Sequence, residues 1–200
     1  IVMSLTSFIG PKPNLLGIDE TNPPMRLEVH QPVLTQEDMD SLLNLEKSTK
    51  GRYKSQVLDI TYKVKESAEG SEAAIAALCT AAERAVARGY NVLILSDRAV
   101  SETRVALPAL LACAAVHHHL VREGLRTSTG LVVDTGSARE VHHFALLAGY
   151  GAEAVCPWLA FDSIANMGDM LPAGLEAKDA KKRFIKGINK GLLKVMSKMG

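Results

Sequence analysis

The sequence predicts an α/β domain built from alternating β-strand/α-helix units around a mainly parallel sheet. Short runs of β-branched and apolar residues recur along the middle of the chain, and helical stretches separate them. Alternation at this spacing favours parallel strands joined by right-handed helical crossovers. The 200 residues, 47% of them hydrophobic, are enough for one domain with its own core.

Residues 1–54 are predicted to form an extended lead-in that contains one helix. Prolines and glycines are dense between residues 8 and 34, and they interrupt both helices and strand ladders, so we expect few regular elements there. Thr35 is a suitable N-cap for a helix from Gln36 to about Glu46. Acidic residues in the first turns of that helix complement its dipole.

Residues 55–165 are predicted to form the βα core. A nearly continuous apolar run at 91–95 is typical of a strand buried on both faces. Glycine ends the first helix, and proline suits the first turn of the second. The expected elements are, in chain order, strand 57–62, helix 72–88, strand 91–95, helix 108–124, strand 130–134, helix 138–148 and strand 154–156.

Residues 166–200 are predicted to form a linker and a last helix from about Ala177. One stripe of this helix is basic and another is apolar. The basic stripe consists of Lys178, Lys182, Lys186, Lys190, Lys194 and Lys198, and the apolar one of Ile185, Ile188, Leu192, Val195 and Met199. A solvated face is the default interpretation of the lysines, and docking to an acidic or phosphate-bearing partner is the alternative. Gly187 and Gly191 weaken the helix unless a neighbouring domain packs closely against it.

Charge and cysteine content exclude several classes of function. A formal net charge of +1 gives no field that would attract nucleic acid or an anionic membrane. No apolar run is long enough to span a bilayer, and no signal peptide begins the chain. Three widely spaced cysteines cannot all pair, which indicates a reducing, cytoplasmic setting. The chain opens on Ile1 and closes directly after a helical stretch, so we expect a piece of a longer polypeptide.

Two loops at the predicted carboxyl ends of strands are the first places to look for a ligand site, 96–98 and 134–137. The second resembles the late strand-loop-helix unit of phosphate-binding (β/α)8 barrels, where glycine amides and a helix N-terminus hold a phosphate. Only Gly136 stands where those barrels supply two glycines, and Asp134 adds a negative charge. The alternative is that Asp134 or Ser137 caps the next helix. The candidate cofactor-binding residues are Asp134, Gly136, Ser137, Lys194, Ser197 and Lys198.

The histidines favour packing over metal binding, and we predict no metal site. Consecutive helical residues diverge by about 100°, so the triplet 117–119 cannot converge on one ion. His118 falls in a stripe with Leu107, Leu111, Ala114 and Val121, which predicts a buried imidazole. Cys113 and His117 have the spacing of a ligand pair without a visible third ligand, which leaves a zinc-dependent hydrolase as a minor alternative. None of the common nucleophile, metalloprotease or nucleotide motifs is present, and no catalytic residue is predicted.

Several stretches together resemble the large chain of glutamate synthase. Their order and spacing match along nearly the whole chain. They are Ser7–Gly10, Asn14–Leu16, Pro32–Leu34, Asn91–Arg98, Pro108–Leu111 through His117–Leu120, Ala138–Ala145 and Lys190–Gly200.

The resemblance implies the central domain of an enzyme that converts glutamine and 2-oxoglutarate to two glutamates. In that family the fold resembles a degenerate or incomplete (β/α) barrel. The domain connects an amidotransferase domain to an FMN domain and contributes to the wall of an ammonia path between them. FMN and an iron-sulphur cluster are expected in the full-length enzyme and not in this piece, and a reductase small subunit or ferredoxin is an expected partner of the whole. A stand-alone phosphate- or nucleotide-binding α/β domain is the alternative.

Overall fold

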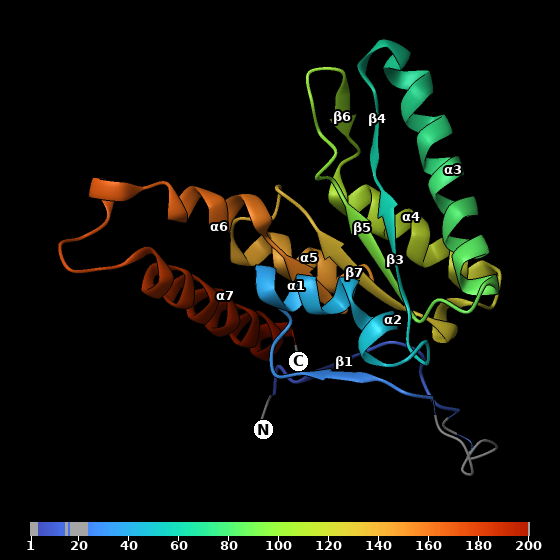
Figure 1. Cartoon of the computed structure of the whole chain (residues 1–200), viewed down its shortest axis with the longest axis horizontal. Helices are drawn as coiled ribbons and strands as arrows, with labels where there is room; N and C mark the ends of the chain where they lie inside the picture. The colour runs from blue at the N-terminus through green and yellow to red at the C-terminus, as the bar shows by residue number, and fades with distance from the viewer. Residues whose placement is uncertain (1–3, 15, 17–23, 200) are drawn as a thin grey trace.

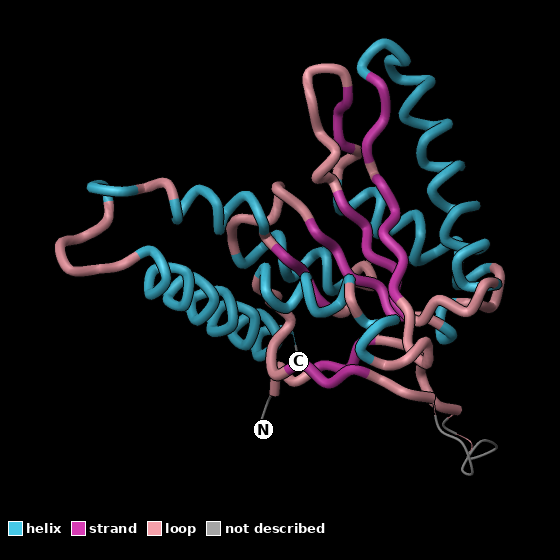
Figure 2. Tube along the Cα trace, viewed as in Figure 1, coloured by secondary structure: helices cyan, strands magenta, loops and turns pink. Residues whose placement is uncertain are grey.

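The computed structural model describes residues 4–14, 16 and 24–199 (Figures 1 and 2). Its centre is a parallel sheet of β3 (Ser55–Asp59), β5 (Val92–Ser96), β7 (Gly130–Asp134) and β8 (Ala154–Cys156), in that order. The predicted α/β class and the parallel sheet are therefore confirmed. Across the described residues the sheet remains open and closes into no barrel. Ile1, Leu15 and Gly200, which entered the sequence predictions, lie outside the described residues.

The three crossover helices cover one face of the sheet. They are α3 (Ser67–Ala87), α4 (Ala109–Arg122) and α5 (Val141–Gly149), and their buried residues share a single core with Leu93, Leu95, Leu131 and Val133. Strands that follow one another in sequence are also neighbours in space, and all their crossovers lie on one side. This is the arrangement of a segment of a (β/α) barrel rather than of a doubly wound sheet.

The N-terminal segment covers the opposite face, which in a barrel would be the interior. Here α1 (Gln36–Leu43), α2 (Leu45–Ser48) and an antiparallel ribbon of β1 (Ser7–Ile9) and β2 (Leu27–Val29) pack against the sheet (Figure 1). The second core consists of Ile9, Leu34, Met39, Leu42, Leu45, Tyr53, Val92, Ile94, Val132, Ala154 and Cys156. Thr35 caps α1 as predicted, and Asp38 completes a capping box. The β1–β2 ribbon was not predicted, because its two short strands are separated by breakers.

The strand predicted at 57–62 is in fact two strands with different partners. The break falls at Ile60, whose amide donates to the Ser96 carbonyl, while Asp59 Oδ1 accepts from the amide of Thr61 at 2.8 Å. Beyond the break, β4 (Thr61–Lys63) pairs with β6 (Arg104–Ala106) in an antiparallel ribbon that extends away from the sheet beside α3 (Figure 2). A local turn bond thus redirects the chain, and hydrophobic periodicity does not reveal it.

Helix boundaries differ from the predictions at three points. The helix expected from Gln36 to about Glu46 ends at Leu43, and the separate short helix α2 follows after Asn44. The first crossover helix starts at Ser67, after a 3-10 turn η1 (Val64–Glu66), so Gly70 lies inside the helix rather than at its start. Glycine is a weak stop signal, since it costs only about 1 kcal/mol in a helix interior. The third begins at Val141 rather than Ala138.

A 3-10 turn, η2 (Arg126–Ser128), precedes β7. After β8 the C-terminal part adds α6 (Trp158–Ala165), the 3-10 turn η3 (Gly168–Met170) and α7 (Ala177–Met199). The sequence predicted α7 but not α6. Helix α7 packs on α5 and α6, with Ile188 and Leu192 buried as predicted, whereas Met199 is 83% exposed. A Cβ at Gly191 would lie 2.2 Å from Cγ2 of Val141, so the close packing that excludes a side chain is on α5 of this chain.

Candidate functional site

The two loops singled out from the sequence meet at the carboxyl edge of the sheet. Strands β5 and β7 are neighbours, and their register places Ser96 beside Asp134. The Ser96 hydroxyl donates to Asp134 Oδ2 at 2.9 Å, and both residues are buried. Gly136 and Ser137 follow directly, so three of the six candidate residues lie together.

Asp97 is the centre of this edge, although no individual role was predicted for it. Its carboxylate, in a residue that is 5% exposed, accepts from three different donors. Thr135 Oγ1 lies at 2.6 Å, Trp158 Nε1 at 2.6 Å, and the amide of Gly136 at 3.0 and 3.1 Å from the two oxygens. Hydrogen bonds of this kind stabilise a buried carboxylate without a counter-ion.

Asp134 forms an ion pair that ties the edge to α1. Arg98 donates to it through Nε at 2.7 Å and Nη2 at 3.0 Å, and the same Nη2 donates to Gln36 Oε1 at 2.7 Å. The guanidinium carbon lies 5.3 Å from the centre of a Trp158 ring. The alternative prediction of helix capping is wrong, because the residue at the N-cap of α5 is Glu140 and it makes no side-chain capping bond.

The loop does not fit a flavin phosphate. The amide of Gly136, which would have to donate to such a phosphate, already donates to Asp97, and the hydroxyl of Ser137 shares a 2.9 Å hydrogen bond with that of Thr135. A Cβ at Gly136 would approach Leu159 and a Trp158 ring atom to 3.2 Å, so a larger residue there would need these side chains to shift by a few tenths of an ångström. An external anion would have to displace a carboxylate of the chain itself.

The other three candidates lie elsewhere. Lys194, Ser197 and Lys198 are exposed on α7, and the Ser197 hydroxyl donates to the Lys194 carbonyl at 2.8 Å. Within the described residues no hydrogen bond or ion pair joins them to the loop at 134–137. The assignment of a cofactor to these six residues stays a prediction, and their separation gives it no geometric support.

A small groove of about 330 Å³ opens beside the carboxyl edge, between α1 and the outer strand β3. Its walls are mainly apolar, and Leu43 and Val57 are 48% and 43% exposed because α1 does not reach across β3. Its charged groups are already paired, Arg98 with Asp134 and Asp59 with Arg104. It is lined by Gln36, Met39, Leu43, Val57, Asp59, Ile94, Ser96, Arg98, Ala99 and Asp134.

A second polar cluster, at the amino edge of the sheet, was missed from the sequence. Arg126 and Glu153 form a buried ion pair with Nη2 and Oε1 3.2 Å apart, and both side chains are 9% exposed. Glu153 Oε2 accepts from the amide of Gly10 at 3.1 Å, and Tyr53 Oη donates to the Ile9 carbonyl at 2.6 Å. The cluster holds the lead-in against the sheet.

Burial and charge shift the acid-base behaviour of this cluster. Burial raises the pKa of Glu153, although Arg126 acts in the opposite direction. Burial, and then the nearby positive charge of Arg126, lower the pKa of His117, whose Nδ1 accepts from Arg126 Nε at 3.1 Å. Gly10 has a φ of +124°, and a Cβ there would lie 1.9 Å from Tyr53 Oη. The residues around Gly10, noted in the sequence only for a resemblance, thus have a packing role.

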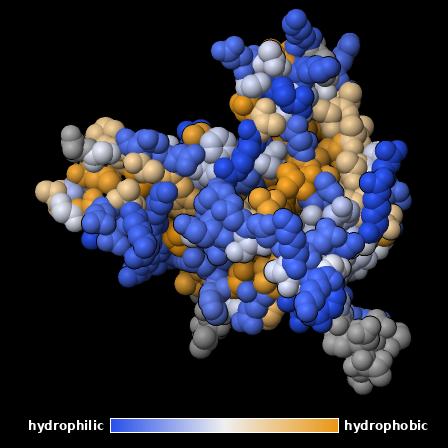
Figure 3. All heavy atoms as spheres, viewed as in Figure 1, coloured by the Kyte–Doolittle hydropathy of each residue, from blue (hydrophilic) through white to orange (hydrophobic). Residues whose placement is uncertain are grey.

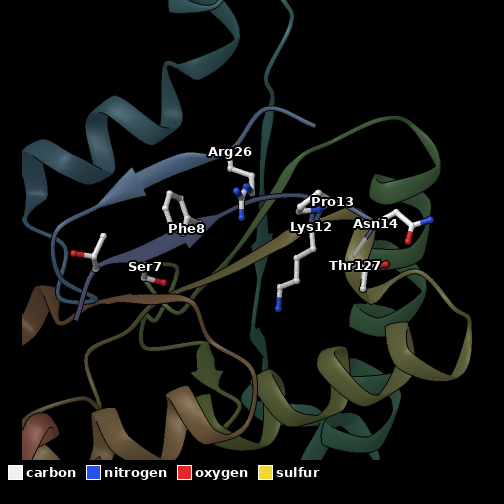
Figure 4. A pocket seen from close by; sticks show the side chains of 8 residues that line it. Ser7, Phe8, Lys12, Pro13, Asn14, Arg26 and Thr127 are labelled. Atoms are coloured by element: carbon white, nitrogen blue, oxygen red, sulfur yellow. The ribbon is translucent and has the colours of Figure 1, made fainter. Parts of the chain in front are cut away.

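An open pocket of about 890 Å³ lies next to the β1–β2 ribbon (Figure 4). Figure 4 shows the side chains of Lys12 and Arg26 around this hollow, and the Arg26 guanidinium carbon is 4.6 Å from the centre of the Phe8 ring. The pocket is lined by Thr6, Ser7, Phe8, Lys12, Pro13, Asn14, Arg26 and Thr127. Two positive charges give it a preference for anions.

The zinc alternative finds no support in the geometry. Burial raises the pKa of the Cys113 thiol to about 12, which disfavours the thiolate that zinc requires. His117 already accepts from Arg126, and no group of three suitable ligands occurs among the described residues.

The prediction of a buried His118 is wrong. His118 is exposed, as are Leu111 and Val121 from the same predicted stripe, at 47% and 51%. The face of α4 that is buried carries Ala109, Ala112, Cys113, Val116 and Leu120. Alanines occur on several sides of this helix, so the apolar pattern could not show which side faces the core.

Fold and site together define an open segment of a (β/α) barrel. The buried polar groups at the carboxyl edge of its sheet form hydrogen bonds and ion pairs with residues of the same chain. In comparison with known proteins, the family model described as the glutamate synthase central domain matches residues 1–200. The chain belongs to this family and is a central domain of glutamate synthase. None of the described helices has the length and apolar character needed to cross a membrane.

Three relatives show the breadth of the family. The chain is 44% identical over 202 residues to the NADH glutamate synthase of Schizosaccharomyces pombe, 37% over 200 residues to the large chain of the NADPH enzyme of Bacillus subtilis, and 38% over 215 residues to a chloroplastic ferredoxin-dependent glutamate synthase of Oryza sativa subsp. japonica. Each match covers 100% of this chain but only 10%, 13% and 13% of the relative. These relationships favour the glutamate synthase assignment over a stand-alone phosphate-binding domain.

Proposed function

We propose that this domain is a structural connector in a glutamate synthase, without catalytic groups of its own. It holds the amidotransferase and FMN domains in register and contributes to the wall of the ammonia path between them. The observation that carries the proposal is the carboxyl edge of the sheet. There, where barrel enzymes place their chemistry, Arg98 pairs with Asp134, and the Asp97 carboxylate accepts from neighbouring residues of the same chain.

The cofactors and partners of the proposed enzyme follow from the same assignment. FMN and the iron-sulphur cluster are assigned to other domains of the full-length enzyme, and for FMN the support is that the loop at 134–137 does not fit a flavin phosphate. The relatives are named for NADH, NADPH or ferredoxin, so the family admits several electron donors, with a reductase small subunit or ferredoxin as the expected partner. Three free cysteines fit a reducing compartment such as the cytoplasm.

The test uses the full-length enzyme that contains this domain. A connector that keeps ammonia inside should leak it when its core is loosened, so Asp97→Ala should raise the free ammonia released per glutamate formed. A coupled assay with an external ammonia-consuming enzyme measures the leak. Asp162→Ala, at an exposed position on α6, is the matched control.

Two results would contradict the proposal. One is glutamine hydrolysis, or dye reduction dependent on 2-oxoglutarate, by the 200-residue chain alone. The other is an Asp97→Ala enzyme that is measurably less stable yet releases no more ammonia than the Asp162→Ala control.

A further inference from the structure

Helix α7 carries a large share of the positive charge of the chain. It carries eight basic residues and one acidic residue, a net charge of +7, whereas the whole chain has +1, so the remaining residues carry −6. The six lysines spaced four apart are all exposed, and Ile188 and Leu192 on the other side are buried. Figure 3 shows hydrophilic atoms gathered over the region of α7.

The first turns of α7 have acidic neighbours within the domain. Lys182 Nζ lies 3.1 Å from Asp179 Oδ1. The pKa of Glu37 on α1 is lowered, mainly because its carboxylate accepts hydrogen bonds from its own backbone amide and from Thr35, and Lys181 and Lys178 add a weaker attraction. Beyond residue 185 no lysine of α7 forms an ion pair with any described residue. These unmatched residues, Lys186, Lys190, Lys194 and Lys198, are called the C-terminal lysine face below.

Like charges at this spacing repel one another along the helix. Residues four apart are neighbours on a helix surface, and pairs of the same sign destabilise it. Four residues exceed one helical turn by about 40°, so only about four successive lysines of the stripe face one direction. The C-terminal lysine face is such a set, with a length of about 18 Å along the axis. An opposing negative surface would relieve the repulsion among all four lysines at once.

A glycine beside this face supports close approach by another molecule. A Cβ at Gly187 would meet nothing within 4 Å, so no packing within the described chain requires glycine there. Glycine in a helix interior is destabilising, and its usual justification is the close approach of another backbone. At Gly191 the close neighbour is Val141, whereas Gly187 has no close neighbour among the described residues.

We propose that the C-terminal lysine face docks on an acidic protein surface supplied by the longer polypeptide of which this domain is part. The net charge of −6 on the remaining residues would repel an extended polyanion such as nucleic acid, whereas a contact confined to one helix face avoids that repulsion. The relatives extend far beyond this domain, and a surface on the same chain has a high effective concentration. The proposal rests on the connector role and identifies the surface through which it acts.

Zero-length carbodiimide cross-linking of the full-length enzyme tests the docking directly, because it joins only ammonium and carboxylate groups in contact. We expect links from the C-terminal lysine face to Asp or Glu residues outside residues 1–200. The links should weaken severalfold at about 1 M salt, where the screening length falls to about 3 Å. Lys47 and Lys63, exposed lysines without an ion pair among the described residues, serve as internal controls.

A charge-neutral variant separates docking from folding. Replacing all four lysines of the face by glutamine keeps helix propensity and removes repulsion, so the domain still folds. The variant should lose the links and be cleaved severalfold faster between domains by a protease. The control variant, with the same loss of charge elsewhere, is Lys47→Gln/Lys63→Gln/Arg84→Gln/Arg88→Gln.

The docking proposal would be overturned if links from the C-terminal lysine face were no more frequent than links from the control lysines. It would also be overturned if these lysines were shielded from reaction by a nucleic acid, so that nuclease treatment exposed them. The ammonia-release assay is a separate readout. If the parent enzyme retains ammonia but forms none of these links, the docking surface is rejected and the connector role remains. If the links form but Asp97→Ala causes no ammonia release, the connector role is rejected and the docking surface remains.

Discussion

Asp97→Ala should be the most informative single substitution in this domain. It leaves three donors without their acceptor, namely the buried Thr135 Oγ1 and Gly136 amide and the partly buried Trp158 Nε1. Each buried donor left unpaired costs about 1–3 kcal/mol. The threonine hydroxyl can turn to Ser137, 2.9 Å away, so two donors remain uncompensated. The expected loss is therefore about 2–6 kcal/mol of unfolding free energy.

Urea unfolding followed by tryptophan fluorescence measures this loss, since Trp158 is the only tryptophan and lies at the altered site. Added formate should restore part of the stability by occupying the vacated position, with a dependence on its concentration that follows mass action. Asp97→Asn, which keeps one acceptor oxygen, should lose less than Asp97→Ala. An Asp97→Ala protein within about 0.5 kcal/mol of the parent, the range of an ordinary surface change, would refute the reasoning.

Two further predictions concern glycine packing and pH. Gly191→Ala should destabilise the chain because its Cβ would lie 2.2 Å from Val141 Cγ2, whereas Gly187→Ala should stabilise the isolated chain by about 0.5–1 kcal/mol in thermal unfolding; equal effects would contradict this contrast. The pKa of His117 is lowered in the folded state by burial and by Arg126, so stability present above pH 6.5 should decline as pH falls below it. His117→Gln should flatten that decline, and an unchanged pH profile would exclude this histidine as its source.

The parallel core could be predicted from the sequence because each of its strands is a local pattern. Val92–Ser96 is buried at every position, and the short apolar run within it, Val92–Leu95, is typical of a strand covered on both faces. The last helix was equally clear, because charge and apolar residues repeat along it in register. The break at Ile60 was not, since it depends on one side-chain hydrogen bond from Asp59.

The polar clusters could be predicted only in part. Position after a strand pointed to Asp134 and Gly136, but the partners of Asp97 include Trp158, 61 residues away. The bond between Gly10 and Glu153 spans 143 residues. No local pattern encodes which carboxylate reaches which amide across such distances, so the loop could be located while its occupant could not.

The packing of the lead-in against the sheet has a consequence for the order in which the domain folds during synthesis. The amide of Leu34 donates to the Val155 carbonyl at 2.9 Å, and the amide of Val155 donates to the Pro32 carbonyl at 2.7 Å. A ribosome adding about 5–20 residues per second separates these partners by roughly 6–24 s. During that interval apolar residues such as Ile9 and Met39 have only an incomplete sheet to cover. Within this domain, the lead-in therefore leaves the ribosome well before the strand that it pairs with, and it completes its native contacts only when that final strand has emerged.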